Sequence, residues 1–349
     1  MHLCFIIHRN GLTCRYHKHH SLMKVRLFAL LMLLSSGIAC QHESATTSKE
    51  SAGSRSGIVY HSPDGGKTWE DISTGLHDSL KPNSLSFHEG ELWLGASDGL
   101  YRGTRYISET VWEKTPLDAR ELGGFTEGRE GRYVISYWHG IFQELPGTGL
   151  WAPMHQHMQD PLVNALTETG TGSLLAGCES GIYRSDNRGK SWTQVCKSIR
   201  IISLMQHNGV IIAGSIAGIY RSADDGKTWE RTLTGDLEAR QIYSVREGII
   251  GLVEQDPPVR GVRERGLYLS ADNGLTWKPS GVRPPGAIYS MVVSGNIVYT
   301  VTSTGIYSSE NLGANWTPVN PATNKEDVFT TLISAGGDLY LFVNNGGGC

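Results

Sequence analysis

One short motif recurs seven times along the chain. Each copy has a glycine, an aliphatic residue and an aromatic residue, and is followed by a turn and a tryptophan. The copies begin at Gly57, Gly99, Gly140, Gly181, Gly218, Gly266 and Gly305. They close at Trp69, Trp112, Trp151, Trp192, Trp229, Trp277 and Trp316. A period of about 40 residues built from short apolar runs and turns is typical of a β-propeller, in which each repeat forms one four-stranded blade.

The composition agrees with this interpretation. With 43 glycines, 9 tryptophans and only 19% charged residues among 349, the chain is rich in the residues of turns and buried aromatic contacts. Such a composition favours many short strands over long helices. We therefore predict an all-β fold of seven four-stranded antiparallel blades.

A column of small residues supports the same fold. A second predicted strand, an apolar run, precedes each motif. A first predicted strand precedes that run, and it has a small residue at the same place in each repeat. The small residues are Ser84, Gly124, Ala165, Ser203, Ser244, Ser290 and Thr331. The first strands of a propeller converge on the central channel, where close packing favours small side chains. We therefore expect this column to line the innermost strands.

The two ends of the repeat region complement each other. The last unit, 331–344, has only first and second strands, whereas the first unit, 57–69, has only third and fourth strands. We predict that the N-terminal strands complete the seventh blade and close the ring, which removes two exposed sheet edges.

The N-terminal region has the pattern of a signal peptide. A basic start is followed by an apolar run over 27–34 and by small residues before Cys40. These small residues resemble the lipobox of bacterial lipoproteins, in which Gly37 is atypical. We predict a lipoprotein signal peptide over 23–39, with Cys40 as the lipid anchor. The alternative is ordinary cleavage of a signal peptide near Ala39, which would leave Cys40 as a free thiol.

The neighbouring segments lack a globular pattern. Residues 1–22 show no pattern of a targeting segment. We predict that they come from a mis-assigned upstream start and that translation begins at Met23. Residues 40–56 are small and polar, which predicts a flexible tether, and residues 57–345 form the propeller. These features predict a protein of the cell envelope, lipid-anchored at the outer membrane or facing the periplasm.

The net charge argues against a nucleic-acid partner. Residues 1–39 carry five basic residues and no acidic ones, so Lys and Arg fall from 31 to 26 against 34 Asp and Glu. An excess of acidic residues does not provide the basic footprint that phosphate binding requires. We expect no nucleic-acid partner and contact with the membrane through the lipid anchor only.

In five units, the turn after the motif reads Ser-x-Asp/Asn-x-Gly and leads to the tryptophan. We call this turn, with its tryptophan, the box. The box residues are Ser62, Asp64, Gly66 and Trp69; Ser185, Asn187, Gly189 and Trp192; Ser222, Asp224, Gly226 and Trp229; Ser270, Asp272, Gly274 and Trp277; and Ser309, Asn311, Gly313 and Trp316. An Asp or Asn in such a turn accepts hydrogen bonds from nearby backbone N–H groups, and the glycine supplies a positive φ. The units that end at Trp112 and Trp151 lack the box.

These turns resemble the Asp-box (BNR) repeat of sialidases, sortilin-like receptors, xyloglucan-cleaving enzymes and photosystem II assembly factors. The resemblance extends over 57–344, nearly the whole mature domain. In those families the box lies on outer hairpin turns, away from the binding face, which implies that the boxes are structural here too.

Candidate functional residues fall in the loops of the opposite face. The binding candidates are Arg120, Arg200, Arg240, Arg260, Arg263, Arg265, Trp138 and His139, because guanidinium groups and aromatic rings suit a carboxylate or an acidic partner. The long loop over 254–266 is unusual for a compact domain. Weak catalytic candidates are Asp256, Glu254, Tyr243 and Tyr289. The alternative is that all of these residues are solvated rim groups.

Two further sets of residues are expected to carry no chemistry. Cys178 and Cys196 could form a disulfide in an oxidising envelope, but they fall on strands that we expect to be separated by a third, which favours two unpaired thiols. His155 and His157, with Asp160, lack a second pair of ligands, so we predict no metal site and no cofactor.

Two functions remain open. The first is a monomeric, non-catalytic scaffold that binds a protein or glycan through one face of the propeller. The second is a sialidase-like or xyloglucanase-like glycoside hydrolase acting on an extracellular glycan, which needs either a pair of carboxylates or a tyrosine nucleophile with an acidic partner beside arginines.

Overall fold

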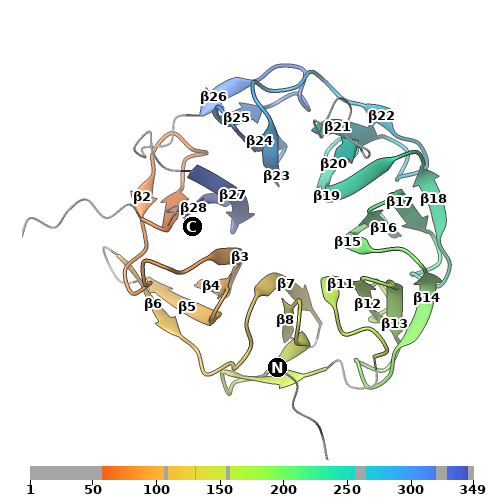
Figure 1. The fold of residues 1–349 in the computed structure, drawn as a ribbon, viewed down its shortest axis with the longest axis horizontal. Coiled ribbons are helices and arrows are strands. Elements are labelled where there is room, and N and C mark those ends of the chain that lie inside the picture. Colours follow the sequence, from red (N-terminus) through yellow and green to blue (C-terminus); the bar gives the residue numbers. More distant parts are fainter. Residues whose placement is uncertain are drawn as a thin grey trace, which may run out of the picture. The chain divides into compact units, whose positions relative to one another are not determined.

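The computed structural model describes residues 57–105, 109–129, 131–154, 158–255, 265–319 and 328–344. They form seven four-stranded antiparallel sheets arranged in a ring (Figure 1). The predicted all-β, seven-bladed fold is therefore confirmed. The predicted segments 1–22, 23–39 and 40–56, with Cys40, lie outside the described residues.

Blades 1 to 3 follow one another along the chain. Blade 1 comprises β3 (Pro82–His88), β4 (Glu91–Ala96), β5 (Gly99–Arg105) and β6 (Thr110–Lys114). Blade 2 comprises β7 (Leu122–Gly128), β8 (Gly131–Ser136), β9 (Gly140–Leu145) and β10 (Leu150–Pro153). Blade 3 comprises β11 (Val163–Glu168), β12 (Leu174–Cys178), β13 (Gly181–Ser185) and β14 (Thr193–Lys197).

Blades 4 to 6 repeat this order. Blade 4 comprises β15 (Ile201–His207), β16 (Val210–Ser215), β17 (Gly218–Ser222) and β18 (Glu230–Leu233). Blade 5 comprises β19 (Leu237–Val245), β20 (Gly248–Gln255), β21 (Arg265–Ser270) and β22 (Lys278–Pro279). Blade 6 comprises β23 (Ile288–Ser294), β24 (Ile297–Thr302), β25 (Gly305–Ser309) and β26 (Thr317–Val319).

Blade 7 is built from both ends of the repeat region. It comprises β27 (Val328–Ala335), β28 (Asp338–Asn344), β1 (Val59–Ser62) and β2 (Glu70–Asp71). β1 pairs antiparallel with β28, with Val59 opposite Phe342 and Tyr60 opposite Leu341. The Val343 N–H donates a hydrogen bond to the Ile58 carbonyl at 3.0 Å. The predicted closure of the ring by the N-terminal strands is therefore confirmed.

The seven first strands surround the centre of the ring (Figure 1). Each packs against the first strand of the next blade, and β27 packs against β3 to complete the circle. Buried apolar side chains fill the seams between neighbouring blades. One such cluster joins Leu94 of blade 1 to Phe342 of blade 7.

Most of the predicted column of small residues lies on these inner strands. Ser84, Gly124, Ala165, Ser203, Ser290 and Thr331 each follow a β-bulge in the first strand of their blade. In β19 this place belongs to Gln241, so the prediction for Ser244 is wrong. The spacing from the bulge to the turn is the same in β19 as in β3, and Ser244 lies one residue before the end of β19, on the surface.

The blade topology creates two different faces. We call the side with the second-to-third-strand loops and the connections between blades the connection face. We call the side with the first-to-second-strand turns and the third-to-fourth-strand turns the hairpin face. The described residues include no helix long and apolar enough to cross a membrane.

Candidate functional site

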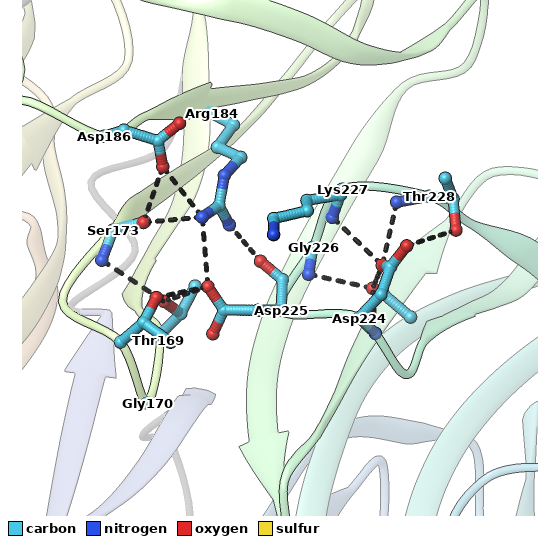
Figure 2. Close-up of polar contacts among 12 residues, drawn as sticks. Thr169, Gly170, Ser173, Arg184, Asp186, Asp224, Asp225, Gly226, Lys227 and Thr228 are labelled. Atoms are coloured by element: carbon cyan, nitrogen blue, oxygen red, sulfur yellow. Dashed lines mark hydrogen bonds and ion pairs between the residues drawn. The ribbon is translucent and has the colours of Figure 1, made fainter.

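The Asp boxes lie on the hairpin face, and their polar groups are used within their own turns. In the box of blade 4, Asp224 accepts hydrogen bonds from the N–H groups of Lys227 and Thr228 and from the Thr228 hydroxyl, at 2.6 to 3.1 Å (Figure 2). Ser222 Oγ donates to Asp224 Oδ1 and accepts from the Gly226 N–H. Each carboxylate oxygen of this box therefore has a local donor.

The same bonding lowers the pKa of the box carboxyls. The backbone and hydroxyl hydrogen bonds from Thr68 lower the pKa of Asp64 to about 2. The hydroxyl and backbone hydrogen bonds from Thr276 likewise lower the pKa of Asp272 to about 2. Such carboxylates are ionised at neutral pH, which does not suit a general acid.

Each box also packs against the preceding blade. A Cβ on Gly226 would lie 2.5 Å from Leu175 Cδ1 of blade 3, and one on Gly274 would lie 2.5 Å from Ile212 Cδ1 of blade 4. The box glycine is thus needed for close approach as well as for its positive φ. This packing gives the boxes a role in joining blades.

On the connection face, a row of neighbouring residues crosses blades 2 to 4. It consists of Tyr137, Trp138, Glu179, Arg200 and Ile216, which we call the connection-face band. Trp138 is 61% exposed and Ile216 is 43% exposed. The Trp138 ring stands edge-on to Tyr137, with ring centroids 4.8 Å apart. The Ile216 N–H donates to the Arg200 carbonyl at 3.2 Å. The band therefore combines two exposed apolar side chains with a charged centre.

Glu179 forms that centre. Its Oε1 accepts from the Tyr137 hydroxyl at 3.2 Å, from Asn164 Nδ2 at 3.1 Å and from Arg200 Nε at 2.9 Å. Asn164 also donates to the Ile201 carbonyl, so the three blades are fastened together at this point. Almost half of the Arg200 side chain remains exposed. The band thus presents a guanidinium and an indole from a fixed base.

A second cluster lies at the connection-face end of blade 5. The carboxylate of Glu254 is buried and accepts from Arg240 Nε at 3.0 Å and from Arg265 Nε at 2.6 Å. Arg265 also donates to the carbonyls of Ile288 and Tyr289 in blade 6, both at 2.8 Å. Three of the predicted residues therefore form one ion network, centred on a buried carboxylate, that joins two blades.

The remaining candidates occupy different surroundings. Tyr243 donates its hydroxyl to the Met291 carbonyl at 3.0 Å, and burial raises its pKa to about 12. Tyr289 and Arg120 are exposed. His139 is also exposed and contacts Ser136 Oγ at 3.0 Å. Asp256, Arg260 and Arg263 lie outside the described residues, as do His155 and His157.

Sequence reasoning missed Glu179, the charged centre of the connection-face band, and its partner Tyr137. Tyr137 and Glu179 lie 42 positions apart, in the second-to-third-strand loops of successive blades. The repeat alignment places those loops side by side, so the adjacency could have been found. The direction of each side chain could not have been found.

Asp160 and the cysteines have structural surroundings. Asp160 accepts from the N–H groups of Leu162 and Ser180 at 3.0 and 2.8 Å. Cys178 and Cys196 are both free thiols, on strands separated by β13, as predicted. Within the described ranges, no group of three or more His, Cys, Asp or Glu side chains is placed to hold a metal ion.

Comparison with known proteins identifies the repeat. The BNR-Asp box repeat family matches residues 182–195, which span β13 and the box of blade 3. No curated protein sequence matches the chain. The local match falls on the same residues that form the turn described above.

Solved structures are similar in fold. YCF48 bound to D1 peptide is 16% identical, with a TM-score of 0.56 over 76% of this chain and 94% of that one. The extracellular domain of a putative one-component system from B. thetaiotaomicron is 14% identical, with a TM-score of 0.59 over 77% of this chain and 38% of that one. An ancestral GH74 enzyme is 14% identical, with a TM-score of 0.52 over 74% and 39%. The chain is a seven-bladed β-propeller, and its third blade contains a match to the BNR-Asp box repeat.

Proposed function

We propose that this propeller is a non-catalytic binding module that holds a peptide or protein partner on its connection face, across blades 2 to 4. The observation that carries the proposal is Trp138, a large, exposed side chain held edge-on by Tyr137 beside the half-exposed Arg200. Trp, Tyr and Arg are the residues that most often dominate binding energy at protein interfaces. A rigid aromatic side chain also loses little conformational entropy when it is covered.

The fixed base of the band supports this role. Because Glu179 joins Tyr137, Asn164 and Arg200, the loops of three blades are ordered before a partner arrives. Preorganisation lowers the entropic cost of association. The solved structure of YCF48 with D1 peptide supports the more general point that a propeller of this fold can bind a peptide.

The proposal includes the envelope location expected from the N-terminal region. In it, the lipid on Cys40 is the only membrane contact, and the propeller acts as a monomer that binds a protein, with a glycan as the alternative partner. Metabolic labelling with a clickable fatty acid tests this part. Label is expected on the wild-type chain and not on the Cys40→Ala variant, and label on both would contradict it.

A glycoside hydrolase is the second candidate, and one observation favours it. The hydroxyl of Tyr137 lies 3.2 Å from Glu179 and close to Arg200, which is the set of groups that a sialidase-like mechanism needs. However, burial and the charge of Glu179 raise the pKa of Tyr137, which opposes an ionised nucleophile. Binding without turnover is therefore the better-supported function.

The test is a peptide selection followed by affinity measurement. Peptides selected from a random phage-displayed library on the wild-type propeller are titrated against Trp138→Ala and against Leu150→Ala. Leu150 is the matched control, because it is 51% exposed on the hairpin face. We expect Trp138→Ala to lose about tenfold or more in affinity, as hot-spot truncation does, and Leu150→Ala to remain unchanged.

Two results would contradict the binding proposal. The first is a set of peptides whose affinity depends on Leu150 and not on Trp138. The second is hydrolysis of sialosides or β-glucans by the wild-type chain that disappears in Tyr137→Phe. That result would establish the second candidate instead.

A further inference from the structure

His61 occupies an unusual place at the joint where the ring closes. It lies on β1 and is only 3% exposed. Its Nδ1 lies 2.6 Å from Glu70 Oε1, and its Nε2 lies 2.8 Å from Asp338 Oδ2. Both ring nitrogens of a buried imidazole therefore face carboxylate oxygens.

The partners come from opposite ends of the propeller. Glu70 lies opposite His61 on β2, whereas Asp338 is 277 positions away and begins β28. The imidazole also stacks on Tyr340 of β28, with ring centroids 5.0 Å apart. Tyr340 packs in the cluster that includes Leu92 of blade 1. His61 thus connects the first strands of the chain to the last, beside the seam with blade 1.

Two carboxylate acceptors require two N–H donors from the ring. A neutral imidazole has one N–H, and only the imidazolium has two. The other charged or titratable groups around the cluster are Arg105 of β5, whose Nη2 lies 3.9 Å from Glu70, and Tyr340. Two carboxylates and one guanidinium therefore surround the ring.

We propose that His61 is a proton-dependent clamp on the closure of the propeller ring. In its protonated form it holds β1, β2 and β28 together through two charge-assisted hydrogen bonds. Loss of the proton leaves a lone pair against one carboxylate and weakens the joint between β1 and β28. This inference concerns the hairpin-face side of blade 7 and is independent of the binding proposed for the connection face.

The direction of the pH dependence follows from proton linkage. If the closed joint binds one more proton than the open joint, its stability falls as the pH rises. Closure is therefore weaker once the ring has only one N–H for its two carboxylate partners.

Amide hydrogen exchange of the full chain tests the clamp. The Val343 N–H reports the joint, because it bonds to the Ile58 carbonyl, and the Gly226 N–H reports the box of blade 4. After correction for intrinsic rates, we expect exchange at Val343 to rise relative to Gly226 between pH 6 and pH 9. The rise should be about tenfold or more, which is the effect of losing one hydrogen bond between charged groups.

The variants separate the clamp from an ordinary histidine. His61→Gln and Asp338→Asn should each abolish the pH-dependent rise at Val343. The matched control is His88→Gln, because His88 contacts Glu127 at 2.8 Å but has a more exposed side chain. It should keep the wild-type rise. If His61→Gln does not fold, Asp338→Asn decides the question alone. A rise that persists in Asp338→Asn, or equal rises at Val343 and Gly226, would overturn the proposal.

Discussion

The seams between blades are of two kinds, and the seam between blades 3 and 4 contrasts with the seam between blades 1 and 2. The seam between blades 3 and 4 contains the Asp box of blade 4. There Asp225 has a positive φ, its carbonyl accepts from Arg184 Nη1, and its carboxylate accepts from Arg184 and Thr169 (Figure 2). Blade 5 repeats the carbonyl contact, since the Asn273 carbonyl accepts from Arg221 Nε at 2.8 Å. The box thus offers backbone as well as side chains to the preceding blade.

The seam between blades 1 and 2 has no box, and a cluster of charged and aromatic side chains fills it. The Arg132 guanidinium lies 4.2 Å from the centre of the Trp93 ring and forms two hydrogen bonds with Glu144. The Trp93 ring packs edge-on against Trp151. Among the described residues, three nitrogens of this cluster are buried without a hydrogen-bond partner: Trp93 Nε1, Trp151 Nε1 and Arg132 Nη1. In the contact between Arg184 and Asp225 at the boxed seam, only Arg184 Nε is buried without a partner.

The difference teaches that an Asp box satisfies polar groups locally, whereas a seam without one concentrates its interactions on a single charged side chain. Loss of one side chain should therefore cost more at a seam without a box.

The largest effect is expected from Arg132→Ala. Removing this buried guanidinium leaves Glu144 without its partner and uncovers Trp93, and breaking a buried ion pair in this way lowers the free energy of unfolding by about 3 to 5 kcal/mol. Chemical denaturation measures the loss. Arg102→Ala is the control. The Arg102 guanidinium also lies over the Trp93 ring, but the Arg102 side chain, which pairs with Glu91, is half exposed. It should cost at most about 1 kcal/mol, and equal costs would remove the contrast.

A smaller effect is expected from Gly226→Ala in the box of blade 4. Gly226 and Gly209 have the same φ of 81°, but a Cβ on Gly226 would meet Leu175 at 2.5 Å, whereas one on Gly209 would meet nothing within 4 Å. Gly209→Ala should cost about 1 to 2 kcal/mol for its backbone conformation alone. Gly226→Ala should cost about 1 to 3 kcal/mol more, because it also overpacks the seam. Equal free energies of unfolding would show that the box does not join blades.

The smallest effect is expected from Asp272→Asn, and it should appear mainly in acid. Because the pKa of Asp272 is about 2 in the folded protein, its contribution is present above the unfolded pKa and is lost as the pH falls toward 2. The variant should lack this part of the acid dependence. At neutral pH it should resemble the wild type, since Asn187 and Asn311 already fill this place in two boxes. Denaturation at pH 7, 4 and 2.5 checks both statements.

Much of the fold was predictable because it follows from the repeat. The period, the box turns and the complementary chain ends required seven blades closed by β1 and β28. The error at Ser244 arose because the place after the bulge in β19 is held by Gln241, a large residue that breaks the pattern of small ones. Repeats predict which strands are neighbours, and they do not require the same type of residue at each place.

The candidate site was less predictable, because it depends on contacts between repeats. Arg200, Trp138 and Glu254 could be selected as residue types in loops of one face. Their partners, Tyr137 and Glu179 in one cluster and Arg265 with Arg240 in another, depend on the directions of side chains in neighbouring blades. Those directions are set by loop conformation, which varies from blade to blade.

Closure of the ring by its two ends is the central claim, and a cysteine pair tests it most directly. Tyr60 and Leu341 lie opposite each other on β1 and β28, at a spacing suited to a disulfide. In the variant with Tyr60→Cys and Leu341→Cys, mild oxidation of the native protein should yield tryptic peptides linked through these two positions. The single variants should give no such link. Native, oxidised protein in which these two cysteines remain unlinked, or form bonds only to Cys178 or Cys196, would contradict closure of the ring.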